Sequence, residues 1–580
     1  MLPVIVLVPV IIAAFLALAT GSRKLTGYVA TLAAAVSFVL SILLLYNRSV
    51  HSEVAWFSIG SYAVHLSFVT APLNMLLLLI VSGIGTLICW YSVGYIETPS
   101  QRGRFFFELL IFMAAMMLFA ISANFVTMFI GWELLGITSY LLIGFWHWKE
   151  KVPRAARKAI TTIIIGDIAI LMAMIILWSS YHTFNFSSIL SAPYSSAITV
   201  SMSLVLIGVF TKSAQFPFHE WLADAMEGPT PVSAFLHSST MVKAGVFLVA
   251  VLLPLFIKAG LGPVLIAVGV VTVVLGASNA LTEHHIKRIL AYSTIEDLGL
   301  MFIALGFNAL AAAMLLFLVQ AFYKAAIFMG AGSIMRANDE DTEIFNSYGS
   351  GANRMLLVSN AIAAVSLAGI FPLSGFFGKF AVESAVSIPI YIILLVIDVA
   401  SSAYIFRWLF ITMRQPEHSS LSKARYSHIP MSMLAPQAIL AAAVVAGGYA
   451  FFVLPGYTGL PSLSFNVIGA ILETIMVAAG FAAAYIIYRK NPDRIPYTRL
   501  HKLAFNNPYV NSAYSAIAKS FYAVGYAVSG LNTLIDDIFE DAGDAFKYFG
   551  SAGRRIESGQ IGLYALVFAL GIIALFIIFG

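Results

Sequence analysis

The sequence has little charge and almost no cysteine. Its single cysteine, Cys89, excludes a disulfide framework and a zinc or iron–sulfur site built by this chain alone, because each needs several ligands. Only 10% of the 580 residues are charged, whereas 60% are hydrophobic, a balance outside the range of soluble globular proteins. The net charge of +5 comes from basic residues in short loops. Membrane proteins commonly carry such residues there, because they set the orientation of the spans. We therefore predict an all-α polytopic membrane protein that binds lipid and no nucleic acid.

Apolar runs recur along the whole chain and predict about sixteen transmembrane helices. The first run is interpreted as a span and not as a signal peptide, because no basic segment precedes it and a second run follows at once. The predicted spans lie near 2–19, 27–46, 71–96, 105–121, 124–146, 159–179, 198–226, 232–255, 261–281, 288–306, 309–335, 355–380, 385–413, 432–455, 465–488 and 559–580.

The distribution of basic residues predicts the orientation of these spans. If the loop with Arg23 and Lys24 is cytoplasmic and the spans alternate, Arg48 and Lys258 are the basic loop residues that fall outside. If one span were miscounted, every later loop would be assigned to the opposite side of the membrane, and the asymmetry would be lost. We therefore expect a multi-pass protein of the cell (plasma) membrane with both termini outside.

The region after the fifteenth span differs from the rest. A polar linker with several prolines leads into 509–548, where apolar residues recur near helical spacing and acidic residues gather late, which predicts a lateral amphipathic helix. It either covers its own bundle or reaches along neighbouring subunits. The predicted segments are the N-terminal helices, two antiporter-like repeats, the C-terminal helices, the linker with the lateral helix, and a final anchor, at 1–103, 104–255, 256–414, 415–490, 491–557 and 558–580.

Charged residues in apolar spans are costly and usually functional. Lys212 stands inside the apolar run of the seventh span, which is broken five residues later at Pro217. Glu133 and Asp167 lie in the middle of the fifth and sixth spans, where a carboxylate is either half of an ion pair or a proton carrier. Broken helix at membrane depth survives where it is buried in protein or lines a wet cavity. The combination indicates an ion path.

The following spans carry more candidate relay residues. His237 and Lys243 share one polar stretch with hydroxyl residues in the eighth span, and histidine suits proton relay because it titrates near neutrality. Lys324 lies in the eleventh span, and Lys379 follows a second Phe-Pro break at Pro372. Two interrupted helices with buried lysines in corresponding halves indicate an inverted-repeat transporter. We expect two inverted five-helix repeats and two broken helices.

Four long motifs carry a family resemblance. GWELLGITSYLLIGFW, KSAQFPFHEWLADAMEGPTPVSAFLHSSTMVKAG, IKRILAYSTIEDLG and FPLSGFFGKF resemble signatures of the antiporter-like subunits of respiratory complex I and of Mrp-type cation/proton antiporters, over 105–414. The lateral helix and sixteenth span are similar to the distal, subunit L type. The resemblance implies that Glu133 and Lys212 form an ion pair whose separation drives proton movement. It also implies that Lys324 and Lys379 are the central relay and exit lysines.

The sequence departs from that family pattern at three places. Gln320 stands one turn before the central lysine, where relatives usually have histidine, and Phe380 follows the exit lysine where aspartate is usual. Glu383, one turn after Lys379, is then the expected partner of that lysine. The pair Glu296-Asp297 resembles the related subunits of membrane-bound hydrogenases.

These observations predict a proton-translocating, non-redox subunit of a complex I-type NADH (or other donor):quinone oxidoreductase. It would carry no cofactor or metal, while flavin, iron–sulfur clusters and quinone are expected in partner subunits. Other membrane subunits are its expected partners, and sodium remains open as an alternative to the proton. The alternatives are a subunit of a Mrp-type sodium/proton antiporter, a membrane-bound hydrogenase arm, or a structural partner in an inorganic-carbon uptake complex.

Overall fold

The computed structural model describes residues 2–21, 25–46, 50–59, 62–414, 426 and 428–490. It divides into one unit of Met1–Ala55 and His65–Pro496, and a second of Trp56–Val64 and Tyr497–Gly580. All residues discussed below as functional lie in the first unit. The predicted lateral helix at 509–548 and the last predicted span at 559–580 lie outside the described residues.

The first part of the chain contains three long helices and a β-hairpin. Its elements are η1 (Leu2–Leu7), α1 (Val8–Thr20), α2 (Leu25–Leu44), β1 (His51–Ile59), β2 (Tyr62–Val69) and α3 (Pro72–Tyr95). The two strands form one sheet, so the all-α prediction is wrong here. Aromatic and β-branched residues on both sides of the dipeptide Gly60-Ser61 are the sequence signal for this hairpin.

The middle of the chain consists of helices joined by loops. Its first half contains α4 (Pro99–Ala120), α5 (Phe125–Ile143), α6 (Lys151–Tyr181), α7 (Phe186–Ser191), α8 (Ser196–Lys212), α9 (Glu220–Asp224), η2 (Ala225–Glu227), α10 (Thr230–Ser238), α11 (Met241–Val251) and α12 (Leu253–Lys258). Its second half contains α13 (Gly262–Thr282), α14 (Ile286–Gly306), α15 (Leu310–Ala337), η3 (Ile344–Asn346), η4 (Ser350–Ala352), α16 (Arg354–Ala368), α17 (Ser374–Glu383) and α18 (Ile388–Met413). The remaining described elements are α20 (Met431–Ala446), η5 (Gly447–Tyr449), α21 (Ala450–Thr458) and α22 (Val467–Lys490).

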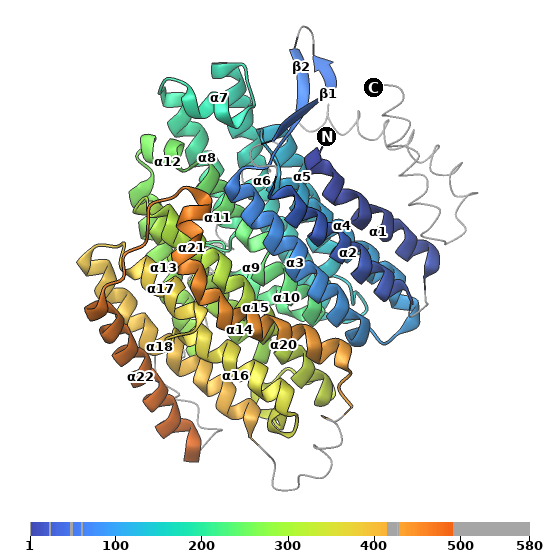
Figure 1. The fold of residues 1–580 in the computed structure, drawn as a ribbon, viewed down its shortest axis with the longest axis vertical. Coiled ribbons are helices and arrows are strands. Elements are labelled where there is room, and N and C mark those ends of the chain that lie inside the picture. Colours follow the sequence, from blue (N-terminus) through green and yellow to red (C-terminus); the bar gives the residue numbers. More distant parts are fainter. Residues whose placement is uncertain are drawn as a thin grey trace, which may run out of the picture. The chain divides into compact units, whose positions relative to one another are not determined.

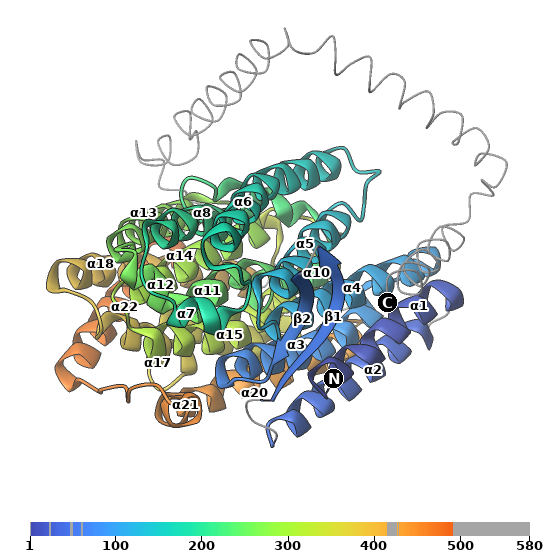
Figure 2. The same cartoon turned by 90° about the horizontal axis from the view of Figure 1, so that it is seen from above.

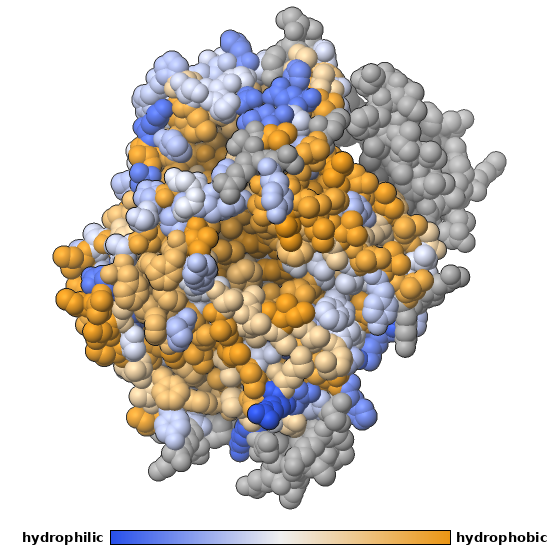
Figure 3. All heavy atoms as spheres, in the orientation of Figure 1, coloured by the Kyte–Doolittle hydropathy of each residue, from blue (hydrophilic) through white to orange (hydrophobic). Residues whose placement is uncertain are grey.

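Within the described residues, thirteen helices are long and apolar enough to cross a membrane. Two shorter apolar helices, α8 and α16, precede the two predicted breaks. These fifteen helices coincide with the first fifteen predicted spans. Figure 3 shows the matching surface, where apolar side chains dominate the middle of the visible face and hydrophilic ones gather toward its ends.

The two predicted breaks are present, and each contains a Phe–Pro cis peptide bond, Phe216–Pro217 and Phe371–Pro372. A third interruption was not predicted. The helix leaves regular geometry at Ser239 and Thr240, between α10 and α11. No proline marks this site, and a run of hydroxyl residues competes for backbone hydrogen bonds instead: Thr240 Oγ1 donates to the Phe235 carbonyl at 2.7 Å.

Figures 1 and 2 show the order of the helices in the bundle, with α1 and α2 at one end and α18 and α22 at the other. Between them, α6 packs closely on α8. A Cβ added at Gly166 would lie 2.7 Å from the Gly208 Cα and 1.9 Å from Thr211 Oγ1. Glycine therefore permits this close helix crossing, which brings α6 beside Lys212 at the end of α8.

Candidate functional site

The first charged cluster joins α5, α6 and α8 around Lys212. The Lys212 side chain is fully buried, and its Nζ lies 3.7 Å from Asp167 Oδ1. The same Nζ donates to the Trp132 carbonyl at 2.5 Å and lies 4.1 Å from the centroid of the Trp132 ring. Trp132 Nε1 in turn donates to Asp167 Oδ1 at 2.6 Å. One tryptophan thus holds both members of the ion pair in place.

Glu133 lies at the edge of this cluster. It is half-buried, and neighbours on its helix, Leu134 and Ile137, are exposed. Successive residues of a helix project about 100° apart, so Glu133 turns outward when Trp132 faces the core. Among the described residues, the ion pair of Lys212 is with Asp167, and Glu133 acts on it only at longer electrostatic range. The structure therefore gives Lys212 a different direct partner from the one that the resemblance implied.

The second cluster lies at the interruption between α10 and α11. His237 is buried, and among the described residues neither ring nitrogen has a hydrogen-bond partner. Lys243 is also fully buried. Its Nζ donates to the carbonyl of Phe317 and lies 4.6 Å from the centroid of that ring. Buried polar atoms are normally hydrogen-bonded, so His237 is placed to bind ordered water.

The third cluster is the central one and joins α14 to α15. Lys324 Nζ lies 3.1 Å from Asp297 Oδ2 and donates to Ser293 Oγ at 2.5 Å. Asp297 Oδ2 also accepts a hydrogen bond from Tyr323 at 3.1 Å. Lys324 and Asp297 are both buried, so each compensates the charge of the other in a place that water does not screen.

Gln320 stands one turn before Lys324, at the position where the family resemblance leads one to expect histidine. Its side chain is buried, and both amide atoms lack a hydrogen-bond partner within the part of the chain that the structure describes. An amide offers both donors and an acceptor. It can therefore orient water beside the central lysine, although it does not exchange a proton as imidazole does.

The fourth cluster surrounds Lys379. Its Nζ lies 3.6 Å from Glu296 Oε1 and 3.5 Å from Asp398 Oδ1. Glu296 accepts hydrogen bonds from the hydroxyls of Ser401 and, at 3.0 Å, Tyr404. The ion pairs of Lys379 among the described residues are thus with α14 and α18. Glu383, predicted as the partner one turn along α17, makes none of them.

Glu383 belongs instead to a group of carboxylates. All three members, Glu383, Asp398 of α18 and Glu473 of α22, are buried and lie within electrostatic range of one another. Asp398 also contacts Lys379, so the group lies beside that lysine.

Comparison with known proteins gives two family matches. Residues 122–404 match the family model described as NADH:quinone oxidoreductase/Mrp antiporter, TM, and residues 56–106 match NADH-Ubiquinone oxidoreductase (complex I), chain 5 N-terminus. NADH-quinone oxidoreductase subunit L of Buchnera aphidicola subsp. Schizaphis graminum is 33% identical, over 84% of this chain and 83% of the relative. The chain belongs to the NADH:quinone oxidoreductase/Mrp antiporter family.

Other members of the NADH:quinone oxidoreductase/Mrp antiporter family resemble the chain over most of its length. F(420)H(2) dehydrogenase subunit L of Methanosarcina mazei is 30% identical, over 94% of this chain and 92% of the relative. A chain in the structure of the Mrp complex from Dietzia sp. DQ12-45-1b has a TM-score of 0.74 at 22% identity. That match covers 90% of this chain and 60% of the Mrp chain, and it shows the shared fold.

Four buried carboxylates of this family member were not among the predicted site residues. They are Glu296 and Asp297 of α14, Asp398 of α18 and Glu473 of α22. Each is an acidic residue in an otherwise apolar span. The rule that singled out Glu133 and Asp167 applies equally to them and was sufficient to find them.

Proposed function

We propose that the chain is the proton-translocating, subunit L-type membrane subunit of a complex I-type quinone oxidoreductase. The observation that supports this function best is the row of buried lysines, Lys212, Lys243, Lys324 and Lys379. Each lies in a span and donates to a carboxylate or a backbone carbonyl. A chain that only packed against its neighbours would have no need of four ammonium groups at this depth.

In the proposed mechanism, charge movement near Glu133 sets the stability of the Lys212 ammonium. Lys212 forms its ion pair with Asp167, and the charge of Glu133 acts on it from a longer distance. When that field changes, the ammonium shifts toward or away from Asp167, and its proton passes through water. The next buried bases in the row are His237 and Lys243.

The second half of the row carries the proton to its exit. Lys324 receives it and exchanges it against Asp297, which lies next in sequence to Glu296, a partner of Lys379. From Lys379 the proton reaches the carboxylates Asp398, Glu383 and Glu473. Each transfer changes the charge next to the neighbouring site, so the buried lysines and carboxylates gain and lose protons as a coupled group and not as independent residues.

The chain performs no redox chemistry in this proposal. Partner subunits hold the flavin, the iron–sulfur clusters and the quinone, and neighbouring membrane subunits bind along this chain. The match to an F(420)H(2) dehydrogenase subunit over nearly its whole length supports donors besides NADH. The proposed location is the plasma membrane, and the asymmetry of basic loop residues supports an orientation with both termini outside.

The function is tested with Lys324→Met in the intact complex. We expect proton transport into sealed vesicles to fall at least about tenfold, because the central ammonium and its exchangeable proton are lost. Lys258→Met is the matched control, since Lys258 is an exposed lysine at the end of α12. Transport at the normal rate in Lys324→Met, at equal complex content, would contradict the relay.

The partners that co-purify with the chain distinguish the enzyme classes. A flavin and iron–sulfur arm supports the quinone oxidoreductase. A nickel–iron hydrogenase supports a hydrogenase membrane arm, and small membrane subunits alone support an antiporter.

A further inference from the structure

A row of alternating charges joins α6 to α14 by way of α9 and η2. Lys158 comes from α6 and Arg288 from α14, and the three carboxylates come from the second half of the broken seventh span. In order of contact, the members are Glu220, Lys158, Asp224, Arg288 and Glu227. The relay described above uses none of these five residues, so the row is open to another role.

Asp224 is the shared member of the row. Its Oδ2 accepts a hydrogen bond from Lys158 Nζ at 2.8 Å, and its Oδ1 lies 3.7 Å from Arg288 Nη2. Each of the two cations also has a carboxylate of its own. Lys158 Nζ lies 3.0 Å from Glu220 Oε2, and Arg288 Nη2 lies 3.1 Å from Glu227 Oε1. Loss of the Asp224 charge would therefore divide the row into two separate ion pairs.

The two helices that Asp224 joins each carry a carboxylate of the relay. On α6, Asp167 follows Lys158 by nine residues, and on α14, Asp297 follows Arg288 by nine residues. Each separation is about 14 Å along the helix axis. These two carboxylates are the partners of the first and the central relay lysine. The row thus connects the two relay ion pairs through two continuous helices.

The short helix α9 also contacts α8 beside the first relay lysine. Trp221 of α9 is buried, and its Nε1 donates to the carbonyl of Thr211 at 2.8 Å. Thr211 directly precedes Lys212. A displacement of the end of α8 therefore acts on α9, and so on Asp224, in addition to its effect on α6.

The central part of the row is shielded in part from solvent. The side chains of Lys158, Asp224 and Arg288 are 39%, 35% and 30% exposed. An isolated surface ion pair contributes little, but partly buried charges are screened less, and a network of several charges holds its geometry better than one pair. The row can therefore fix the position of α6 relative to α14.

We propose that Asp224 is a positioning residue that links proton transfer at Lys212 to proton transfer at Lys324, an inference that rests on the proposed function. Because Asp224 holds Lys158 and Arg288 at once, a shift of α6 that follows a change at Lys212 also displaces α14. Coupling of this kind passes through ion-pair networks and rigid helices that contact one another. Without the Asp224 charge, the two ion pairs of the relay would respond independently.

The test is Asp224→Asn in the intact complex, which removes the shared charge and leaves each cation one carboxylate. Proton uptake by sealed vesicles is measured per electron transferred, at equal complex content. We expect Asp224→Asn to lose at least about half of the proton uptake that Lys324→Met loses, because residues along such a link change coupling by a factor of about two or more. Asp224→Glu keeps the charge and should recover most of the uptake.

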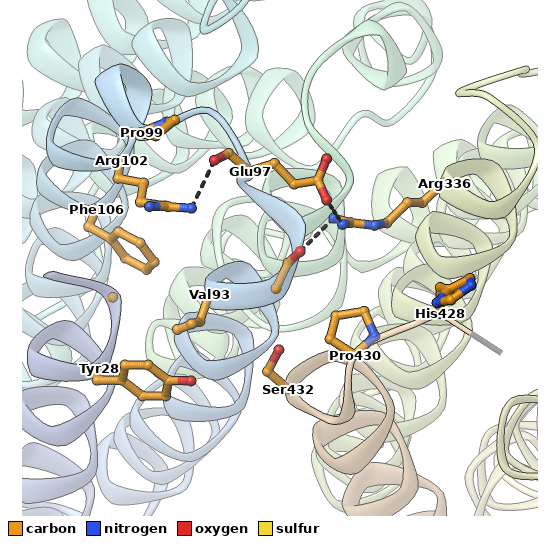
Figure 4. Close-up of a pocket in the computed structure, with 12 residues that line it drawn as sticks. Tyr28, Val93, Glu97, Pro99, Arg102, Phe106, Arg336, His428, Pro430 and Ser432 are labelled. Carbon is orange, nitrogen blue, oxygen red and sulfur yellow. Dashed lines mark hydrogen bonds and ion pairs between the residues drawn. The ribbon is translucent and has the colours of Figure 1, made fainter. Parts of the chain in front are cut away.

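Two other charge deletions serve as controls. Glu220→Gln also removes a carboxylate from the row, but it leaves the bridge through Asp224 in place. Glu97 lies outside the row, in the segment between α3 and α4, and Figure 4 shows its carboxylate against Arg336 of α15. No residue of the proposed relay lies on α3 or α4. We expect Glu220→Gln and Glu97→Gln to keep the normal number of protons per electron.

Arg288→Gln cuts the bridge at α14, so it decides the matter if Asp224→Asn does not assemble. A normal number of protons per electron in the variant that cuts the bridge would overturn the link, even if its melting temperature falls. Equal loss in Glu220→Gln would also overturn it. Normal proton uptake by Lys324→Met would instead overturn the proposed function, so the two failures are distinguishable.

Discussion

Asp167→Asn isolates the charge that the structure places beside Lys212. The substitution keeps the shape of the side chain and an oxygen that can accept from Trp132 Nε1. It removes a negative charge 3.7 Å from Lys212 Nζ. At an effective dielectric constant of about 20, a pair at that distance interacts by about 4.5 kcal/mol. Glu133 lies beyond ion-pair distance and is half exposed, so it cannot replace that stabilisation.

We expect Asp167→Asn to stop most proton transport while the complex still forms. The assay is proton uptake by sealed vesicles with complex content and electron-transfer rate normalised. Glu150→Gln is the control, because Glu150 and Arg154 form an exposed pair on 82% and 71% exposed side chains, which contributes roughly 0–1 kcal/mol. Glu133→Gln should have a smaller effect than Asp167→Asn. Normal transport by Asp167→Asn together with complete loss in Glu133→Gln would refute the argument and restore Glu133 as the working partner.

Four further perturbations test other parts of the molecule. Lys212→Met and Lys212→Arg should both lose proton transport in vesicles, because arginine keeps its proton; full transport by the arginine variant would make Lys212 a fixed charge. Glu473→Gln should slow transport at normal complex content, and an unchanged rate would exclude α22 from the path. Gly166→Ala should lower the free energy of unfolding of the purified complex by roughly 1–3 kcal/mol through overpacking. An unaltered melting curve would contradict the close approach of α6 to α8. Deletion of 509–580 should weaken attachment to neighbouring subunits in detergent, and equally robust assembly would make this segment dispensable.

Features that depend on one residue and its immediate neighbours could be predicted from the sequence. Pro217 and Pro372 mark the broken helices because proline removes a backbone donor wherever it stands. The break at Ser239 and Thr240 has no such marker, and hydroxyl residues occur in many unbroken spans. The hairpin at 51–69 has an alternating pattern in its second strand, but it lies between two long apolar runs, where the spans alone predict only a connecting loop.

The choice of partners within the site could not be predicted in the same way. Glu133 and Asp167 are equally acidic residues in equally apolar spans, and only the rotation of α5 and the close approach of α6 to α8 decide which one reaches Lys212. The same holds for Lys379, whose nearest acidic neighbour in sequence is Glu383, whereas its ion pairs come from α14 and α18. The partner of each lysine depends on how different helices pack against each other, and the spacing of residues along one helix does not reveal this.

Glu296 and Asp297 share a peptide bond on α14, yet each neutralises a different lysine. A rigid helix cannot shift one of them without moving the other. Any displacement of α14 therefore changes the surroundings of Lys324 and Lys379 together, so in the proposed relay a movement of this one helix would link the transfer at Lys324 to the transfer at Lys379.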